Sequence, residues 1–125
     1  MQQLLPALGN GSNIVFVSSL AARAAAGTIS AYAATKGAVE TLVKHFAVAL
    51  GPRGIRVNAV APGVVETDMS NFTKTESGRE IALAMQALKR LAQPDDIASV
   101  VAFLASDDAR WVSGHSIHVD GGSKL

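Results

Sequence analysis

The sequence predicts an α/β fold that forms part of a doubly wound parallel sheet, with about three strands and flanking helices. A short continuous apolar run at residues 14–17 is typical of a strand buried on both faces, and residues 55–60 are interpreted as a second strand. A long amphipathic stretch at residues 30–50 lies between them and predicts a helix. A strand, a helix and a second strand make a βαβ unit, which is almost always right-handed and places its strands in parallel.

The elements before the long helix are predicted mainly from turn signals. Residues 1–8 are typical of the end of a helix, although they carry no helix start signal of their own. Gly and Asn within residues 9–12 indicate a turn. The apolar run 14–17 then forms a strand whose carboxyl end falls near Ser19, and an Ala-rich connection at residues 20–27 leads to the helix.

Gly and Pro end both the long helix and the second strand. We expect the helix to stop at Gly51 and Pro52. Its predicted apolar stripe consists of Val39, Leu42, Val43, Phe46 and Leu50. The second strand stops at residues 62–63, and a polar loop at residues 64–75 follows it.

Two further helices and a short strand are predicted beyond that loop. One helix spans about residues 76–89, with one face formed by Ile81, Met85 and Leu88. The other begins at Pro94, because proline suits the first helical position and Asp95 and Asp96 favour the positive end of the helix dipole. Its core stripe consists of Ile97, Val100, Val101 and Leu104. Residues 116–119 form the last strand.

The composition excludes several classes of protein. A chain of 125 residues fits one domain (residues 1–125), and 49% apolar with 17% charged residues argues against disorder. The net charge of +1 gives no support for nucleic-acid binding, and the lack of cysteine excludes a disulfide scaffold. No signal peptide or membrane span is recognisable, so we expect a cytoplasmic protein. We expect no metal site, because His115 and His118 would point to opposite faces of a strand.

Tyr32 and Lys36 lie four residues apart in the predicted long helix, so their side chains project from one face. An ammonium beside a phenol favours the phenolate, and such a pair can act as a general acid or base on a carbonyl or alcohol. Alone, this spacing more often marks an ordinary exposed pair. Ser19 supports the catalytic interpretation, because ligands bind at the carboxyl ends of parallel strands. The alternatives are that Ser19 only caps or turns the chain, or that Ser18 takes its role.

Ser19 together with the segment Tyr32-Ala33-Ala34-Thr35-Lys36 resembles the catalytic signature of the short-chain dehydrogenase/reductases, and Ser18 does not match that spacing. Similar motifs of that family follow in order: residues 56–63 (RVNAVAPG), 64–69 (VVETDM), Arg90 with 94–98 (PDDIA), 113–115 (SGH) and 119–122 (VDGG). The resemblance runs from about residue 14 to residue 122 and is closest to 3-oxoacyl-carrier-protein reductase-like members. It implies the C-terminal half of a Rossmann-like domain.

The resemblance implies an NAD(P)-dependent oxidoreductase that transfers a hydride between a nicotinamide cofactor and a small carbonyl or alcohol substrate. In this role Tyr32 exchanges the substrate proton, Ser19 orients the substrate oxygen, and Lys36 favours ionised Tyr32 and binds the nicotinamide ribose. The implied cofactor-binding residues are Tyr32, Lys36, Pro62, Gly63, Val65 and Thr67. NAD and NADP are not distinguished. The resemblance also implies a homo-oligomer in the full-length form, for which the weakly charged long helix is a candidate surface.

The sequence departs from the family because it lacks the Gly-rich first half. A dinucleotide site needs a Gly-rich turn between a strand and a helix to hold the pyrophosphate, whereas the turn at residues 9–12 precedes a strand. We therefore expect this chain alone to bind NAD(P) poorly and to show little turnover. The alternative is a truncated, catalytically inactive chain that acts only as an oligomerisation partner, or the product of a decayed gene.

Overall fold

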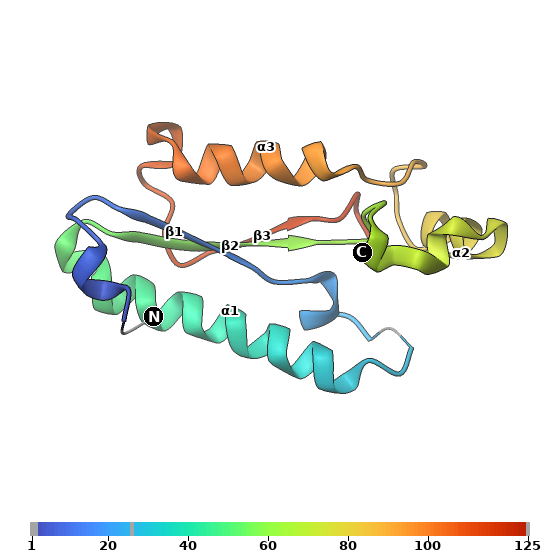
Figure 1. The fold of residues 1–125 in the computed structure, drawn as a ribbon, viewed down its shortest axis with the longest axis horizontal. Helices are drawn as coiled ribbons and strands as arrows, with labels where there is room; N and C mark the ends of the chain where they lie inside the picture. Colours follow the sequence, from blue (N-terminus) through green and yellow to red (C-terminus); the bar gives the residue numbers. More distant parts are fainter. Residues whose placement is uncertain (1–2, 26, 125) are drawn as a thin grey trace.

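A parallel sheet of three strands forms the centre of the computed structural model, which describes residues 3–25 and 27–124. The strands lie in the order β1 (Asn13–Val17), β2 (Arg56–Pro62) and β3 (Ser116–Val119). Helix α1 (Ser30–Leu50) covers one face of the sheet and α3 (Pro94–Ala105) covers the other (Figure 1). The predicted α/β fold with a parallel sheet is therefore confirmed.

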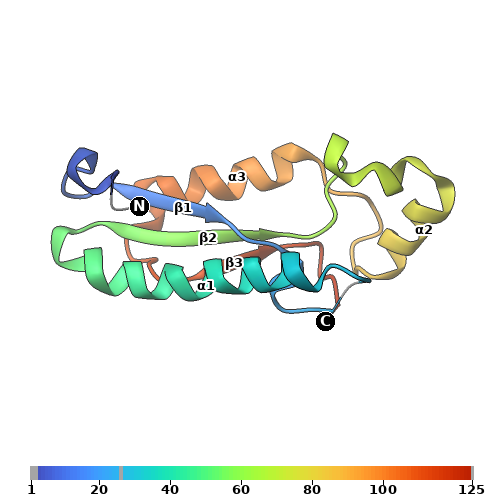
Figure 2. The same cartoon turned by 60° about the horizontal axis from the view of Figure 1, so that its bottom comes forward.

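The remaining elements are α2 (Glu76–Ala84) and several short 3₁₀ helices. Helix α2 lies beyond the carboxyl ends of the strands rather than against a face of the sheet (Figures 1 and 2). The 3₁₀ helices are Leu5–Ala7, Leu20–Ala22, Gly51–Arg53, Asp68–Lys74 and Asp107–Ala109. None of the described helices is long and apolar enough to cross a membrane.

Two apolar clusters form the core, one on each face of the sheet. Between the sheet and α1, the buried residues are Leu50, Ile55 and Val57. Between the sheet and α3, they are Val60, Leu104 and Ala109. Successive residues of β1 serve opposite clusters, because side chains alternate along a strand: Phe16 packs into the first and Val15 into the second. The predicted stripe of α3 is confirmed, since all four of its residues belong to the second cluster.

Three predicted elements have the bounds that the sequence indicated. The long helix spans residues 30–50, the last strand spans residues 116–119, and α3 begins at Pro94. The start of α3 is capped by Asp96, whose carboxylate accepts a hydrogen bond from the Gln93 backbone N–H at 2.8 Å. Local signals were sufficient in these places because hydrophobic periodicity marks α1 and, at the start of α3, proline and the capping residues agree with it.

The prediction for the helix at residues 76–89 was wrong at its end, since α2 stops at Ala84. The backbone N–H groups of Ala87 and Leu88 donate instead to the Gly121 carbonyl, which lies on a distant loop. The expected apolar face is also wrong, because Ile81 is 58% exposed and Leu88 is 61% exposed. Within α1, the predicted stripe holds for Val43 and Leu50, which are buried, but Leu42 is exposed.

The predicted helix end at residues 1–8 is only a single 3₁₀ turn, Leu5–Ala7. Its backbone bond runs from the Ala7 N–H to the Leu4 carbonyl at 2.9 Å. Pro6 has no backbone N–H to donate, so it cannot extend this turn backwards. Residues 1 and 2 lie outside the described residues.

Candidate active site

The carboxyl ends of the three strands meet at one end of the sheet, and the candidate residues follow them. The backbone N–H of Ser18 donates to the Val60 carbonyl at 2.7 Å, which aligns the end of β1 with β2. The N–H of Gly63 donates to the Val119 carbonyl at 3.2 Å, which aligns the end of β2 with β3. Ligands of parallel α/β sheets bind at this end, because the loops there diverge and leave a crevice.

Ser18 and Ser19 are adjacent in sequence but have different surroundings. Ser18 is 2% exposed, and its hydroxyl donates to the Glu40 carboxylate of α1 at 2.9 Å. It is therefore committed to the interior, and the alternative that Ser18 contacts a substrate is not supported.

Ser19 is only partly buried, and its hydroxyl oxygen accepts a hydrogen bond from the Ala21 N–H at 3.2 Å. This contact is the capping role considered above as an alternative. It uses an acceptor site of the oxygen, so the hydroxyl proton of Ser19 stays available for donation to a ligand. Both roles are compatible at this residue.

Tyr32 and Lys36 lie on the first turns of α1, as the four-residue spacing predicts. The Lys36 Nζ is 5.6 Å from the centroid of the Tyr32 ring, a distance at which a cation interacts with an aromatic face. The same ammonium donates to the Val17 carbonyl at the end of β1, at 2.8 Å. This bond fixes Lys36 at the carboxyl end of the sheet, while the Tyr32 side chain is exposed.

Two cavities lie on either side of Gly63. One, of about 180 Å³, is lined by Ser19 and Gly63 together with Leu20, Ala21, Ala24, Ile29, Val64, Phe72, Met85 and Lys124. The other is an open apolar groove of about 710 Å³ beside α3. Four of the predicted cofactor-binding residues line this groove: Pro62, Gly63, Val65 and Thr67. Tyr32 and Lys36 line neither cavity.

Glycine is the only residue type that fits at position 63, between these cavities. A Cβ atom at this position would lie 2.9 Å from both the Cα and the Cβ of Asp120. Any side chain would therefore push apart the ends of β2 and β3.

An ion pair that the sequence patterns above do not indicate joins two loops at this end of the sheet. Arg23 donates to the Asp120 carboxylate at 2.7 Å, and the two residues are 97 positions apart. A usable signal was present, because Arg23 is the only charged residue in the Ala-rich connection at residues 20–27. Burial raises the pKa of Asp120, but the hydrogen bonds from Arg23 and from backbone N–H groups outweigh it, and the net pKa is lowered.

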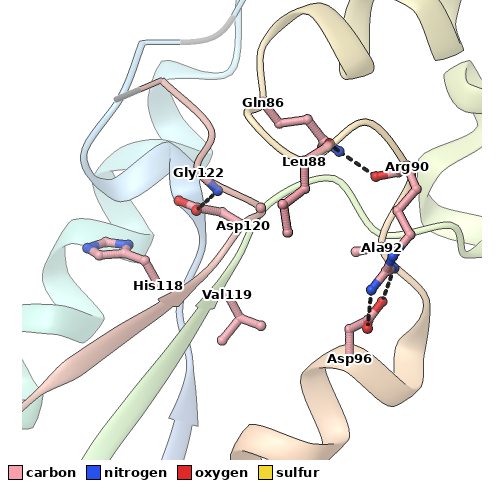
Figure 3. A pocket seen from close by; sticks show the side chains of 10 residues that line it. Gln86, Leu88, Arg90, Ala92, Asp96, His118, Val119, Asp120 and Gly122 are labelled. Atoms are coloured by element: carbon pink, nitrogen blue, oxygen red, sulfur yellow. Dashed lines mark hydrogen bonds and ion pairs between the residues drawn. The ribbon is translucent and has the colours of Figure 1, made fainter.

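A third cavity, of about 320 Å³, lies beside the end of β3 (Figure 3). Its main polar feature is the bidentate pair of Arg90 and Asp96, with N–O distances of 2.6 and 2.8 Å. These bonds, with that from the Gln93 N–H, hold the pKa of Asp96 well below its ordinary value. His118 also lines the cavity, but Figure 3 shows its ring turned away from the Arg90–Asp96 pair. The pair satisfies its own charges, so this cavity offers no free ion for a ligand.

Comparisons with known proteins identify relatives of this chain in sequence and in structure. The sequence profile of a family described as Enoyl-(Acyl carrier protein) reductase matches residues 1–124. L-rhamnose 1-dehydrogenase (NAD(P)(+)) of Azotobacter vinelandii is 43% identical, over 91% of this chain and 45% of that enzyme. The 7alpha-hydroxysteroid dehydrogenase of Bacteroides fragilis is 42% identical, over 90% of this chain and 43% of that enzyme. The chain thus spans about half the length of these curated relatives.

Solved structures resemble the whole chain. The angucycline C-6 ketoreductase LanV with bound NADP superposes with a TM-score of 0.92 at 40% identity, covering 99% of this chain and 48% of that one. A short-chain type dehydrogenase/reductase from Mycobacterium ulcerans gives a TM-score of 0.87 at 35% identity, covering 90% of this chain and 42% of that one. With a family match over nearly every residue and these relatives in sequence and fold, the chain belongs to the short-chain dehydrogenase/reductase family.

Proposed function

We propose that this chain carries the nicotinamide and substrate side of an NAD(P)-dependent oxidoreductase that interconverts a carbonyl and an alcohol. The observation that supports the proposal is the double contact of Lys36, with the ring of Tyr32 and with the end of β1, the strand that Ser19 follows. Lys36 bonds the last carbonyl of β1, Ser19 follows that strand, and Tyr32 stacks beside the Lys36 ammonium. This arrangement supplies a proton carrier, a fixed positive charge and a hydroxyl donor within one region.

Each of the three side chains has a distinct role in the proposal. The Tyr32 hydroxyl gives a proton to the substrate oxygen during reduction and takes it back during oxidation. The Lys36 ammonium places positive charge where negative charge develops on the Tyr32 oxygen, and its bond to Val17 keeps it there. Ser19 donates a hydrogen bond to the same substrate oxygen and thereby orients it.

The described residues fit the nicotinamide end of a dinucleotide. A flat ring suits an open groove that is lined mainly by apolar side chains, and Gly63 lines this groove. In the proposal, Pro62, Gly63, Val65 and Thr67 hold this end, while Tyr32 and Lys36 contact the adjoining ribose. The bound cofactor supplies or accepts the hydride. The LanV structure contains NADP, and the residues of this chain favour neither NAD nor NADP.

The cavity that contains Ser19 favours a substrate with an apolar surface around its carbonyl. Apart from Ser19 and Lys124, every side chain that lines it is apolar or absent. The Lys124 ammonium already donates to the Ala25 carbonyl at 2.9 Å. Each unpaired hydroxyl of a sugar that became buried here would cost about 1–3 kcal/mol. A small apolar ketone therefore fits this cavity better than a polyhydroxylated sugar.

The proposal also includes an oligomeric state, a homo-oligomer, and a location in the cell. The exposed face of α1 includes Val48, which is 80% exposed, and Leu42, which is 44% exposed. Lys44 and His45 lie beside Val48, and this partly apolar helix surface suits contact with a second copy in the full-length form. We place the protein in the cytoplasm, where its nicotinamide cofactor is available.

The experiment that tests the proposed function is Tyr32→Phe in the full-length product of the gene that encodes this chain. The substitution removes only the exposed hydroxyl, so we expect an unchanged melting temperature and a loss of turnover of about 10²–10⁴-fold, the range of general acid–base catalysis. NAD(P)H oxidation is followed by absorbance with a panel of apolar and polyhydroxylated carbonyl compounds. Near wild-type turnover in this variant would exclude Tyr32 as the proton carrier.

The intact mass of the endogenous protein shows whether the cell makes a longer protein or only this chain, and that form is then used in the assay. A mass about twice that of this 125-residue chain is expected if a Gly-rich first half is present in the cell. A mass equal to that of the chain would favour the alternative of an inactive oligomerisation partner.

A further inference from the structure

The residues that follow β3, numbers 120–124, form a loop that we call the C-terminal loop. It contacts the connection between β1 and α1, which spans residues 20–29. One nitrogen of Arg23 in that connection donates both to the Asp120 carboxylate at 2.7 Å and to the Ser123 carbonyl at 2.8 Å. Lys124 donates from its side chain to the Ala25 carbonyl at 2.9 Å. The loop therefore holds the connection at two points.

These contacts matter because the connection has no other polar attachment among its described residues. Its remaining hydrogen bonds are local, such as those from the Ala22 N–H to the Ser19 carbonyl and from the Arg23 N–H to the Leu20 carbonyl. Every described hydrogen bond between residues 20–29 and a distant element has its other partner in the C-terminal loop. Without that loop, the connection would be held only by apolar packing.

Asp120 is itself held rigidly. Its side chain is 6% exposed, and its second carboxylate oxygen accepts the N–H groups of Gly122 at 3.0 Å and Ser123 at 3.3 Å. Figure 3 shows the Asp120 carboxylate folded back onto the Gly122 N–H. Gly121 and Gly122 have φ angles of 62° and 72°, in the left-handed region that favours glycine. The loop conformation thus presents one carboxylate oxygen to Arg23.

On its other side, Asp120 contacts the residue between the two cavities. Its backbone and Cβ lie against Gly63, where an added Cβ would be only 2.9 Å away. Gly63, Lys124 and Ser19 line the same cavity of about 180 Å³. Asp120 therefore spans the gap between the end of β2 and the connection that joins Ser19 to Tyr32.

We propose that Arg23 and Asp120 are positioning residues, whose ion pair fixes the β1–α1 connection so that Ser19 and Tyr32 face one substrate oxygen together. The proposal rests on the proposed function, because it assigns these residues a part in that reaction. Neither side chain needs to touch the substrate. The placement of two catalytic groups is sensitive to small displacements, so a loosened connection should slow the reaction without removing any reacting group.

The test uses Asp120→Asn and Arg23→Gln, alone and combined, in the full-length protein. Asparagine retains the oxygen that accepts the Gly122 and Ser123 N–H groups but loses the charge that faces Arg23. We expect each single variant to lower kcat by about 10- to 100-fold, the cost of misplacing catalytic groups. The KM for NAD(P)H should stay within about twofold, because the groove side of Gly63 is unchanged. The double variant should be no slower than the slower single variant, because both act through one contact.

Two further variants separate positioning from general destabilisation. Arg23→Lys keeps a positive charge near Asp120 and should restore much of the lost kcat. Arg90→Gln removes the exposed bidentate pair with Asp96, which does not contact the connection, and should leave kcat unchanged. If Asp120→Asn and Arg23→Gln lower the melting temperature while kcat per folded molecule stays at the wild-type value, the pair is only structural and the proposal is overturned.

Hydrogen–deuterium exchange supplies a measurement that does not depend on turnover. Backbone amides of residues 20–31 should exchange faster in Asp120→Asn and Arg23→Gln than in the wild type or Arg90→Gln. If the wild type shows no turnover with any substrate, the proposed function fails. The exchange rates alone then show whether the Arg23–Asp120 pair fixes the β1–α1 connection. Unchanged exchange in residues 20–31 would overturn the positioning proposal, whatever the activity.

Discussion

Two segments border the cavity that contains Ser19, and they are built differently. The β1–α1 connection is held by charged and polar contacts to a distant loop, with the Arg23–Asp120 pair at its centre. The segment from residue 64 to residue 84 instead exposes large apolar side chains, with Met69 93% exposed and Phe72 47% exposed. In our proposal the first segment places the groups that move a proton, and the second shapes the space for the substrate. Substitutions in the first should therefore change kcat, and those in the second should change KM.

The largest effect is expected at Lys36. Lys36→Ala removes both the charge beside Tyr32 and the bond to the Val17 carbonyl. We expect kcat to fall by about 10²–10⁴-fold, as for loss of a general acid–base partner, and the KM for NAD(P)H to rise. Steady-state kinetics with each substrate varied in turn measures both. Lys44→Ala, an exposed lysine on the same helix, is the control. An unchanged cofactor KM would show that Lys36 does not bind the ribose.

The two adjacent serines give the sharpest contrast. Ser19→Ala should lower kcat by about 10²-fold, the usual effect of removing one donor to a developing oxyanion. Ser18→Ala leaves the Glu40 carboxylate without its 2.9 Å donor and should cost about 1–3 kcal/mol of stability instead. Thermal unfolding and kcat are measured on both variants. The assignment of Ser19 would be wrong if Ser18→Ala lost turnover and Ser19→Ala did not.

A smaller effect is expected in the apolar segment. Phe72 lines the cavity but is half exposed, so Phe72→Ala should leave stability nearly unchanged. We expect the KM for an apolar ketone to rise by up to about tenfold with kcat within twofold, since an apolar contact contributes about 1–3 kcal/mol of discrimination. A large loss of kcat here would contradict the division between the two segments.

The smallest effect is a pH dependence of stability. The folded state lowers the pKa of Asp120, since the bonds from Arg23 and the backbone outweigh the effect of burial. Such a carboxyl stabilises the fold fully above its unfolded value of 3.8, and this contribution is lost as the pH falls below 3.8 toward the lower folded value. The melting temperatures of wild type and Asp120→Asn should therefore differ most above about pH 4 and converge below it. A difference that grew on acidification would contradict the lowered pKa.

Local patterns were sufficient for the elements whose ends depend on nearby residues. The bounds of α1 and β3 and the start of α3 agree with prediction, because periodicity, glycine, proline and capping residues act within a few positions. The end of α2 could not be predicted in this way, since the Gly121 carbonyl that diverts the chain lies more than thirty residues further on.

In the candidate site, too, features that depend on nearby residues could be predicted, whereas a contact between distant residues could not. The four-residue spacing of Tyr32 and Lys36 predicts their common face, and the structure shows Lys36 stacked beside Tyr32. Strand alternation could also have separated the serines, because Ser18 continues the face of Phe16 that packs under α1. The Arg23–Asp120 pair was missed because its partners are 97 positions apart and neither belongs to a periodic pattern.

The C-terminal loop also has a consequence for the order in which the protein forms. Parallel strands are paired only after long stretches of chain have closed, so folds of this kind are slow to assemble. During translation, residues 120–124 leave the ribosome after every segment that they contact. A nascent chain can therefore pair β1 with β2 while the β1–α1 connection is still free. A chain released before residue 120 is made would therefore keep most of this core, while its β1–α1 connection would lack the polar contacts that hold it.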